Sequence, residues 1–395
     1  MKPIAFVIPW YGSNIRGGAE SECNQLAHCL HDAGISVEVL TTCVKQASDD
    51  RGINTLKEGV FIEDEILVRR FKVRKRNSDR FHAANYKLYN NLPTTLDDEM
   101  AYFEEDINSN SMYKYIAEHK EKYKVFIFMP YLYGIIYNGM KACRDNCIMI
   151  PCLHDESYAY MKLVKESMQN TKGLIFLSQP ECDLAYKLYD LTNVRIAVLG
   201  AYVESGWEKQ CDPNRFRSKY NIYDDFILCA GRKDAGKKVF ELVNYFIQYK
   251  KMHFNNNLKL VLIGGGQIDI PKEFTEQVID LGFVSVEDKR DAMSAAYLLC
   301  NPSFFESFSI VIMESWLVKR PVLVAEQCVV TTNFCLESNG GLFFDSQAVF
   351  CGCVDFLLNN REIADQLGEN GYKYVMNNFI KDRITEKYID FLSQF

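Results

Sequence analysis

The sequence predicts an α/β protein of two domains, because two β-α-β series lie far apart in a chain of 395 residues. The first series runs from an apolar strand at 4–8, through a helix beginning near Glu20, to a strand at 37–40. The second series has strands at 226–230 and 258–263, with apolar residues at helical spacing between them. A hydrophobic content of 48% is enough to bury a core in each domain.

Turn-forming residues in the middle of the chain indicate where the first domain ends. Further apolar runs of strand length extend the first sheet, at 125–129, 148–152, 174–177 and 196–199. The segment 200–215 follows the last of them and contains Gly206, Asp212 and Pro213, which are typical of a linker. We therefore expect an N-terminal domain at 1–205 and a C-terminal domain that begins at 206.

The composition excludes several functional classes. A formal net charge of −7 gives no case for a nucleic-acid partner. Apolar runs stay below the 18 residues that would indicate a membrane span, and the apolar part of the N-terminus is too short for a signal peptide. The 14 cysteines form no C-x-x-C pair, which indicates free thiols in a reducing cytosol rather than disulfides or zinc. We expect a cytoplasmic protein.

The strongest candidate site lies within 298–324. An apolar strand, a loop and a helix follow one another there, and Pro321 opens a second strand. Glu306 falls in the loop and Glu314 in the helix, with seven residues between them. If Ser309 caps the helix, Glu314 lies about 7 Å along its axis, and unpaired backbone N–H groups lie between the two carboxylates.

This arrangement suits a nucleotide sugar, which has a hydroxylated ring at each end and a diphosphate between them. A helix N-terminus attracts phosphate. An ionised carboxylate accepts hydrogen bonds from the two hydroxyls of a sugar diol. The alternative that spacing leaves open is a pair of surface glutamates beside an ordinary buried helix.

The segment E-S-F-S-I-V-I-M-E resembles the E-x7-E element of retaining GT-B glycosyltransferases of family 4, where E-G-F-G is the commoner opening. The resemblance implies two Rossmann-like, doubly wound parallel-sheet domains that face a central cleft. It also implies a donor domain at 206–375, with a C-terminal helix at about 376–395 that packs back on the first domain. Glu306 would hold hydroxyls of the donor sugar and Glu314 the ribose diol. Backbone groups near the sugar and phosphate would be those of Ser307, Phe308, Ser309 and Ile310.

A basic loop after the strand at 226–230 is the second donor element. Arginine and lysine behind a strand end can clamp a diphosphate, although a solvated basic loop is the alternative. The loop resembles the G-R…K element of the same family, which implies that Arg232 and Lys237 bind the leaving diphosphate. By the same resemblance Gly264 lies on the donor side, and a short strand element offers the backbone of Phe283 and Val284 to the base.

The loop after the first strand carries Gly17-Gly18-Ala19-Glu20. Two glycines at a helix N-terminus let a ligand reach the backbone, although a glycine turn without a ligand is the alternative. G-G-A-E is also a form that this loop takes in the same family, where it faces the donor diphosphate and the acceptor. Gly17 and Gly18 are thus donor candidates, and Glu20 is an acceptor-side candidate.

His154 follows the strand at 148–152, and ligands of open α/β sheets lie beyond the carboxyl ends of strands. A lone histidine is more often structural. The pair His154-Asp155 nevertheless resembles the active-site histidine of the family, which contacts the donor sugar. Tyr131 and Tyr133 are assigned to the acceptor side by position.

Residues 69–76 contain six basic side chains in eight. Such a cluster indicates an anionic partner, either the headgroups of the inner membrane face or the phosphates of a lipid-linked acceptor. The alternative is a strand with a solvated edge, whose cations block pairing with another strand. The polar residues at 76–112 predict an irregular excursion over the acceptor side.

The resemblance implies a hexosyltransferase-type enzyme of cell-surface polysaccharide biosynthesis. It would move a sugar from a UDP- or GDP-sugar to a hydroxyl of a glycan or lipid-linked glycan, with retention of configuration. No D-x-D occurs in the sequence, so we expect no metal and no cofactor beyond the donor. Two alternatives remain: a nucleotide-sugar 2-epimerase, which needs an acid and a base beside C2, and a non-catalytic sugar-nucleotide-binding subunit.

Overall fold

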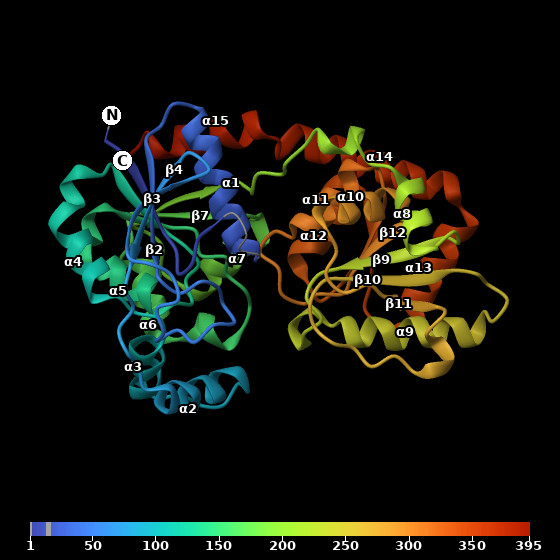
Figure 1. Ribbon diagram of the computed structural model, residues 1–395, viewed down its shortest axis with the longest axis horizontal. Helices are drawn as coiled ribbons and strands as arrows, with labels where there is room; N and C mark the ends of the chain where they lie inside the picture. Colours follow the sequence, from blue (N-terminus) through green and yellow to red (C-terminus); the bar gives the residue numbers. More distant parts are fainter. Residues whose placement is uncertain (1, 13–16) are drawn as a thin grey trace. The chain divides into compact units, whose positions relative to one another are not determined.

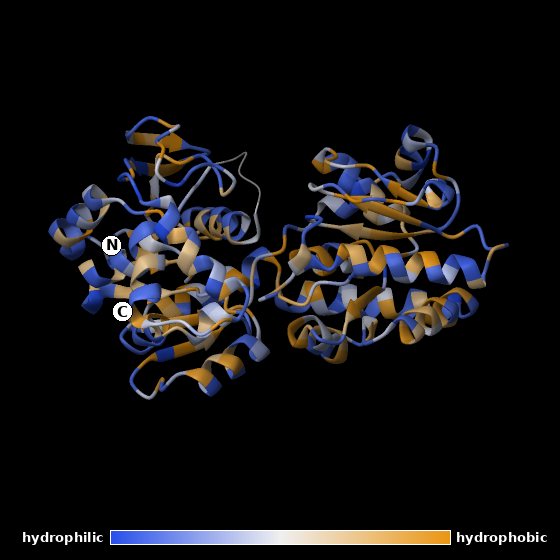
Figure 2. Cartoon of the chain, turned by 90° about the horizontal axis from the view of Figure 1, so that it is seen from below, coloured by the Kyte–Doolittle hydropathy of each residue, from blue (hydrophilic) through white to orange (hydrophobic). Residues whose placement is uncertain are grey.

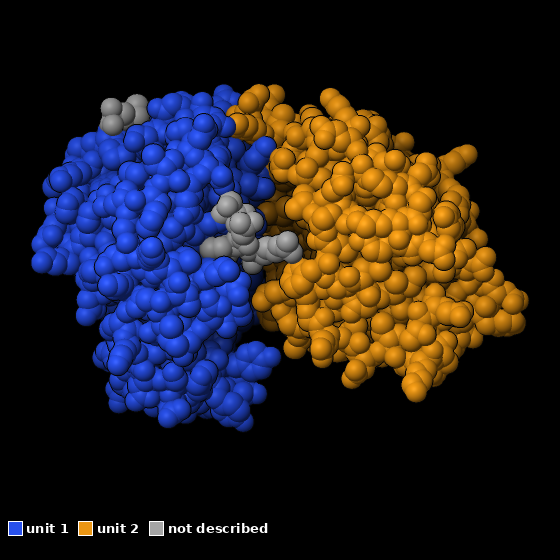
Figure 3. All heavy atoms as spheres, in the orientation of Figure 1, with its two compact units in different colours: residues 1–202, 384–395 blue, residues 203–383 orange. Residues whose placement is uncertain are grey.

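The computed structural model describes residues 2–12 and 17–395, which form two compact units (Figure 3). Unit 1 comprises residues 1–202 and 384–395, and unit 2 comprises Val203–Arg383. The sequence predicted a boundary at 205 and a return to the first domain at about 376.

Unit 1 is built on a sheet with the strand order β3-β4-β2-β1-β5-β6-β7-β8. Its neighbouring strands are parallel, apart from the antiparallel pair of β3 and β4 at one edge. The chain order reverses between β1 and β5, which makes this the topological switch point of the sheet. The strands are β1 (Ile4–Val7), β2 (Val37–Thr42), β3 (Gly59–Glu63), β4 (Ile66–Phe71), β5 (Val125–Phe128), β6 (Cys147–Met149), β7 (Gly173–Phe176) and β8 (Arg195–Val198).

Helices connect these strands and cover the sheet (Figure 1). The first of them ends before Gly34, whose φ of 82° is a left-handed conformation that glycine adopts without strain. The last helix begins at the end of unit 2 and buries Ile384 and Tyr388 in unit 1. The helices are α1 (Gly18–Asp32), α2 (Ser78–Tyr89), α3 (Leu96–Glu105), α4 (Asn110–His119), α5 (Gly134–Ala142), α6 (Lys162–Gln169), α7 (Gln179–Leu188) and α15 (Lys381–Leu392).

The prediction of an irregular excursion at 76–112 is wrong, because this segment contains α2, α3 and the start of α4. Each helix has a side-chain cap, from Asn77, Thr95 and Ser109 respectively, and Thr95 forms a full capping box with Asp98. These caps satisfy backbone N–H groups that a polar loop would leave to water.

Unit 2 contains a parallel sheet with the order β11-β10-β9-β12-β13-β14. Its chain order reverses between β9 and β12. The strands are β9 (Phe226–Ala230), β10 (Lys259–Ile263), β11 (Val278–Asp280), β12 (Leu298–Asn301), β13 (Val322–Ala325) and β14 (Gly341–Phe344). The helices are α8 (Pro213–Tyr220), α9 (Val239–Met252), α10 (Val286–Ala295), α11 (Ile310–Leu317), α12 (Val329–Ser338), α13 (Gln347–Asn359) and α14 (Arg361–Asn378).

The expected strand element at 282–284 is also wrong. The strand ends at Asp280, whose carboxylate accepts a hydrogen bond of 2.9 Å from the backbone N–H of Gly282. Gly282 then takes a φ of 63°, so the chain turns there instead of continuing the sheet.

Each unit has its own core between the sheet and its helices, and most strands are coloured as hydrophobic in Figure 2. Strands β1, β5 and β12 are buried along their whole length, as expected where helices cover both faces of a parallel sheet. Within the described ranges, no helix has the length and apolarity needed to cross a membrane.

Candidate functional site

The order of strands in unit 2 places three predicted donor residues at the carboxyl edge of the sheet. Strand β9 lies between β10 and β12, and all three are parallel, so the loops after them are neighbours. Those loops carry Lys237, Gly264 and Glu306. The edge lies beside the switch point between β9 and β12, where open α/β sheets hold their ligands.

Glu306 and Lys237 form the centre of this group. The ammonium Nζ of Lys237 lies 2.7 Å from Oε1 of Glu306, and the Glu306 side chain is only 12% exposed. Asn301, the last residue of β12, donates a hydrogen bond of 3.3 Å from Nδ2 to the same oxygen. The carboxylate is therefore held between a cation and an amide, both of which orient it.

Ser309 occupies the N-cap position of α11, but its hydroxyl does not cap the helix as the sequence suggested. The hydroxyl instead accepts a hydrogen bond of 2.8 Å from Nδ2 of Asn301. No side chain in the described part of the chain caps this helix. Its first backbone N–H groups are thus available to an anion.

The backbone around Ser309 explains why glycine is the commoner residue there in the family that this segment resembles. Ser309 has a φ of 75°, a left-handed conformation that suits glycine better. Ser307 is not among the described residues with positive φ. Serine thus replaces the commoner glycine at two positions, but only at Ser309 does the backbone conformation favour glycine. The Phe308 side chain packs edge-on against Phe334 and Phe379, so it is held within unit 2.

Glu314 lies in the middle of α11 and is 16% exposed. Its Oε1 lies 2.6 Å from Nζ of Lys289, a residue of α10 that the sequence did not suggest. Its Oε2 is buried and has no hydrogen-bond partner among the described residues. A buried oxygen without a partner is costly, and a ligand hydroxyl would satisfy it.

Arg232 and Lys237 lie in the loop after β9, and their side chains have different partners. Arg232 is 76% exposed, and its Nε lies 3.5 Å from Oδ2 of Asp234. Between them in sequence, Lys233 is almost fully buried, with Nζ 2.9 Å from Oδ1 of Asp280. Lys233 thus secures the loop, while Lys237 reaches Glu306.

Gly264 lies between the backbone of the 282–284 segment and that of the basic loop after β9. Gly264 donates to the carbonyl of Gly282 at 2.7 Å. A Cβ on Gly264 would lie 2.0 Å from the carbonyl oxygen of Gly231, so only glycine fits between the two loops. Phe283 is 67% exposed, and Val284 follows it in the loop before α10.

In unit 1, His154 and Tyr131 converge on one carboxylate. Nδ1 of His154 lies 3.5 Å from Oε1 of Glu156, and the Tyr131 hydroxyl donates to the same oxygen at 3.3 Å. The sequence paired His154 with Asp155, whose carboxylate instead accepts from Tyr160 at 2.7 Å. Burial, and then the charge of Glu156, raises the pKa of Tyr131 well above its ordinary value. Tyr131 is therefore uncharged and serves as a hydrogen-bond donor to Glu156.

The G-G-A-E loop lies at the switch point of the unit 1 sheet. Gly17 and Gly18 begin α1, and the carboxylate of Glu20 accepts a hydrogen bond from the indole of Trp10. The Trp10 ring packs edge-on against Tyr133, with ring centroids 5.0 Å apart. The part of the loop at 13–16 lies outside the described residues.

A buried glutamate that the sequence did not single out supports the His154 loop. Glu181, at the start of α7, accepts hydrogen bonds of 2.6 Å from the backbone N–H groups of Leu153 and Leu177. It thereby joins the segments that follow β6 and β7. Burial raises its pKa from an ordinary value of 4.5 to about 8. The only sequence signal was its place after the Ser178 cap of α7.

The basic segment 69–76 does not present a free cationic surface. Five of its six cationic side chains have a carboxylate within 4 Å: Arg69–Glu38, Arg70–Glu63, Lys72–Glu58, Arg74–Glu105 and Arg76–Asp50. Residues Arg69–Phe71 belong to β4, which lies between β3 and β2, so the alternative of a strand at the edge of the sheet is also wrong. The cations are used within the fold.

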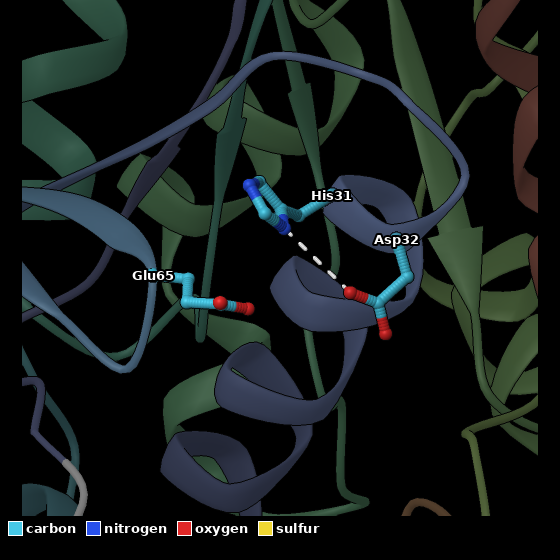
Figure 4. Close-up of side chains that lie close together, drawn as sticks. All are labelled: His31, Asp32 and Glu65. Carbon is cyan, nitrogen blue, oxygen red and sulfur yellow. Dashed lines mark ion pairs between the residues drawn. The ribbon is translucent and has the colours of Figure 1, made fainter.

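One group of described side chains has metal-ligand atoms within 4.8 Å of one another: His31, Asp32 and Glu65 (Figure 4). Nδ1 of His31 lies 3.6 Å from Oδ1 of Asp32. The group lies at the end of α1 and the turn before β4, and therefore at the amino edge of the sheet. It is thus at the edge opposite to His154, and it plays no part in the candidate site.

Comparisons with known proteins show what this chain is similar to. Residues 224–360 match the family model described as Glycosyl transferases group 1. An uncharacterized glycosyltransferase of Methanocaldococcus jannaschii is 28% identical over 200 residues, which are 47% of this chain and 46% of that protein. The matched region thus spans less than half the length of this curated relative.

Solved structures match the whole chain. Sucrose-phosphate synthase from Thermosynechococcus elongatus has a TM-score of 0.72 at 16% identity, and the match covers 100% of this chain and 99% of that one. HepE of Anabaena in complex with UDP and glucose has a TM-score of 0.70 at 14% identity, over 100% of both chains. The fold is therefore the GT-B fold, with two Rossmann-like parallel-sheet domains. Residues 224–360 are therefore similar to the glycosyl transferases of group 1, and the solved structures show the fold of the whole chain.

Proposed function

We propose that this protein is a retaining GT-B glycosyltransferase of family 4, which transfers a hexosyl group from a nucleotide sugar to a hydroxyl of a glycan or lipid-linked glycan. The main support for this proposal is the pairing of Lys237 with Glu306 beside the N-terminus of α11, which has no side-chain cap among the described residues. Glu314, with one buried oxygen unpaired, lies farther along the same helix. Neither the 2-epimerase nor the non-catalytic subunit is favoured by the comparisons.

Each part of the donor has a matching group in unit 2. The ribose diol donates to Glu314, the diphosphate meets the first N–H groups of α11, and the sugar hydroxyls donate to Glu306. HepE was solved with UDP-glucose, which supports a UDP-sugar as donor. From unit 1, His154 is proposed to contact the donor sugar, and Glu20, Tyr131 and Tyr133 belong to the acceptor side.

The chemistry we propose breaks the bond between the anomeric carbon and the diphosphate oxygen, and forms a bond from that carbon to the acceptor oxygen on the same face. The leaving phosphate takes the acceptor proton. Lys237 and Arg232 stabilise the negative charge that develops on the diphosphate, an electrostatic contribution that is often the largest in catalysis. Since these cations can serve the diphosphate, we propose transfer without a metal.

Thermal-shift screening of the full chain against UDP, GDP, ADP and their hexose conjugates tests the proposal. A ligand that binds only the folded protein raises the Tm, and we expect one nucleotide and its sugar conjugate to do so. NMR of that conjugate with the protein then separates the alternatives, because slow hydrolysis supports the transferase and a new epimer supports the isomerase. The absence of a shift with every nucleotide would contradict the proposal.

A further inference from the structure

A pocket in unit 1 lies beside the loop of His154, and its lining includes Asp155 and Glu156 from that loop. Its volume of about 460 Å³ is in the range of small-ligand sites. One wall is the turn between α2 and α3, and the other is the segment after β6. The residues that matter chemically are Asn91, Leu92, Thr94, Asp155, Glu156 and Tyr160.

The two walls are joined by hydrogen bonds, so the pocket exists before a ligand enters. The hydroxyl of Ser157 donates to the carbonyl of Leu88, and the hydroxyl of Tyr158 donates to Oδ1 of Asn85 at 2.8 Å. The capping box of Thr95 fixes the far end of the turn. A preformed pocket binds with a smaller loss of conformational entropy.

The charges of the pocket select against anions. It contains the carboxylates of Asp155 and Glu156, and its described lining has no Lys, Arg or His. The described hydrogen bonds and the His154 contact occupy one oxygen of each carboxylate, from Tyr160 to Asp155 and from Tyr131 to Glu156. The second oxygens can accept hydrogen bonds from hydroxyl groups, whereas a phosphate or carboxylate would be repelled.

The remaining surface of the pocket offers apolar contacts and neutral hydrogen-bond donors to a sugar ring. Leu92 is 46% exposed and Tyr160 is 62% exposed, so both offer apolar surface to the C–H groups of a pyranose. The side chains of Asn91 and Thr94 supply neutral hydrogen-bond donors. Carboxylates, amide and an exposed aromatic ring together match an uncharged, hydroxyl-rich ligand.

We propose that this pocket binds a neutral hexopyranose residue of the acceptor, whose hydroxyls donate to Asp155 and Glu156 and whose C–H face packs on Tyr160. This inference rests on the proposed transferase function, and it names the chemical class of the acceptor. Phosphorylated sugars and uronic acids are excluded from the pocket by its two carboxylates.

Saturation-transfer NMR with the full chain tests the pocket directly. The probes are the methyl pyranosides of glucose, galactose and mannose, together with glucose 6-phosphate and glucuronic acid. We expect at least one neutral pyranoside to bind, and both anionic sugars to give no signal. Asp155→Asn and Leu92→Ala should each weaken binding at least about fivefold, and Glu118→Gln, which changes an exposed carboxylate on α4, should leave it unchanged.

The outcomes separate this inference from the proposed function. Equal binding of the anionic sugars, or unchanged binding in Asp155→Asn, would overturn the pocket assignment. If a nucleotide raises the Tm of the same preparation and no pyranoside binds, the pocket assignment falls and the proposed function stands. If a pyranoside binds and no nucleotide does, the pocket is a sugar site and its role as acceptor site falls with the transferase.

Discussion

Lys237 and Glu306 lie 69 residues apart in the chain, yet their side chains meet at 2.7 Å. Each follows the end of a strand, β9 for Lys237 and β12 for Glu306, and these two strands are neighbours in the sheet. The pair joins a cation suited to a diphosphate with a carboxylate suited to sugar hydroxyls.

Removing the cation should weaken binding of the nucleoside diphosphate. Lys237→Ala deletes a charge-assisted hydrogen bond, which contributes about 1.5–3 kcal/mol, so the Kd should rise at least about tenfold. Calorimetric titration with the nucleotide chosen by the thermal-shift screen measures the change. Lys251→Ala, at the far end of α9, is the matched control and should bind normally. Equal affinities of the two variants would contradict the assignment.

The unpaired oxygen of Glu314 predicts discrimination between ribose and deoxyribose. The wild type should bind the ribonucleoside diphosphate about tenfold more tightly than its 2′-deoxy analogue, because the analogue leaves the carboxylate without one hydroxyl. Glu314→Ala should bind both ligands with similar, weak affinity. Titration of both proteins with both ligands checks this, and a deoxy penalty that survives in the variant would exclude Glu314 as the ribose partner.

Substitutions at Ser309 should separate backbone strain from hydrogen bonding. Ser309→Ala and Ser309→Gly both lose the hydrogen bond with Asn301, but only glycine relieves the left-handed φ of 75°. The glycine variant should therefore be more stable than the alanine variant by about 1 kcal/mol. Urea unfolding of the two variants measures the difference. An alanine variant as stable as the glycine variant would mean that the loop carries no strain.

Glu181 should make stability depend on pH. Its pKa of about 8 in the folded chain exceeds the ordinary 4.5, so the folded state holds a proton that the unfolded state loses first. The stability from this group is present below about pH 4.5 and is lost as the pH rises toward 8, with a slope of at most about 1.4 kcal/mol per unit.

Glu181→Gln removes this titration, although one of the two amides at Leu153 and Leu177 then faces the NH₂ of glutamine. The variant should be less stable than the wild type at about pH 5, and the gap should narrow toward pH 8. Urea unfolding across that range checks the prediction. Curves that stay parallel for the two proteins would show that Glu181 does not titrate in this window.

The basic segment should affect stability more than membrane binding. Arg70 is 8% exposed, holds Glu63 through two hydrogen bonds, and donates to the carbonyl of Tyr11. Arg70→Gln should therefore cost about 3 kcal/mol of unfolding free energy, whereas the exposed Lys75→Gln should cost less than about 0.5 kcal/mol. Flotation with anionic vesicles completes the test. Loss of vesicle binding in Lys75→Gln, at unchanged stability, would restore the membrane hypothesis.

Local patterns of apolar residues were sufficient to predict the strands and helices whose positions are determined by burial. Strand β9 was predicted at its observed bounds, and the strand-loop-helix-strand pattern around Glu306 agrees with β12, α11 and β13. The helices at 76–112 were missed although the signals were present. Phe81, Ala84 and Leu88 recur at helical spacing and are buried, and Thr95 with Asp98 forms a capping box.

Contacts between distant elements could not be predicted from spacing. Lys289 on α10 pairs with Glu314 on α11, which lies 25 residues farther along the chain. Asn301 could have been suggested, because it ends a strand at the ligand-binding edge of the sheet. The order of strands determines such neighbours, and a single sequence does not reveal that order.

The central claim is that Glu306 organises the sugar end of a nucleotide-sugar donor. The most direct measurement is the turnover of the selected nucleotide sugar by Glu306→Gln, with the affinity for the nucleoside diphosphate measured on the same protein. We predict that turnover falls at least about a hundredfold while the Kd for the diphosphate changes less than about threefold. Unchanged turnover in this variant would contradict the account.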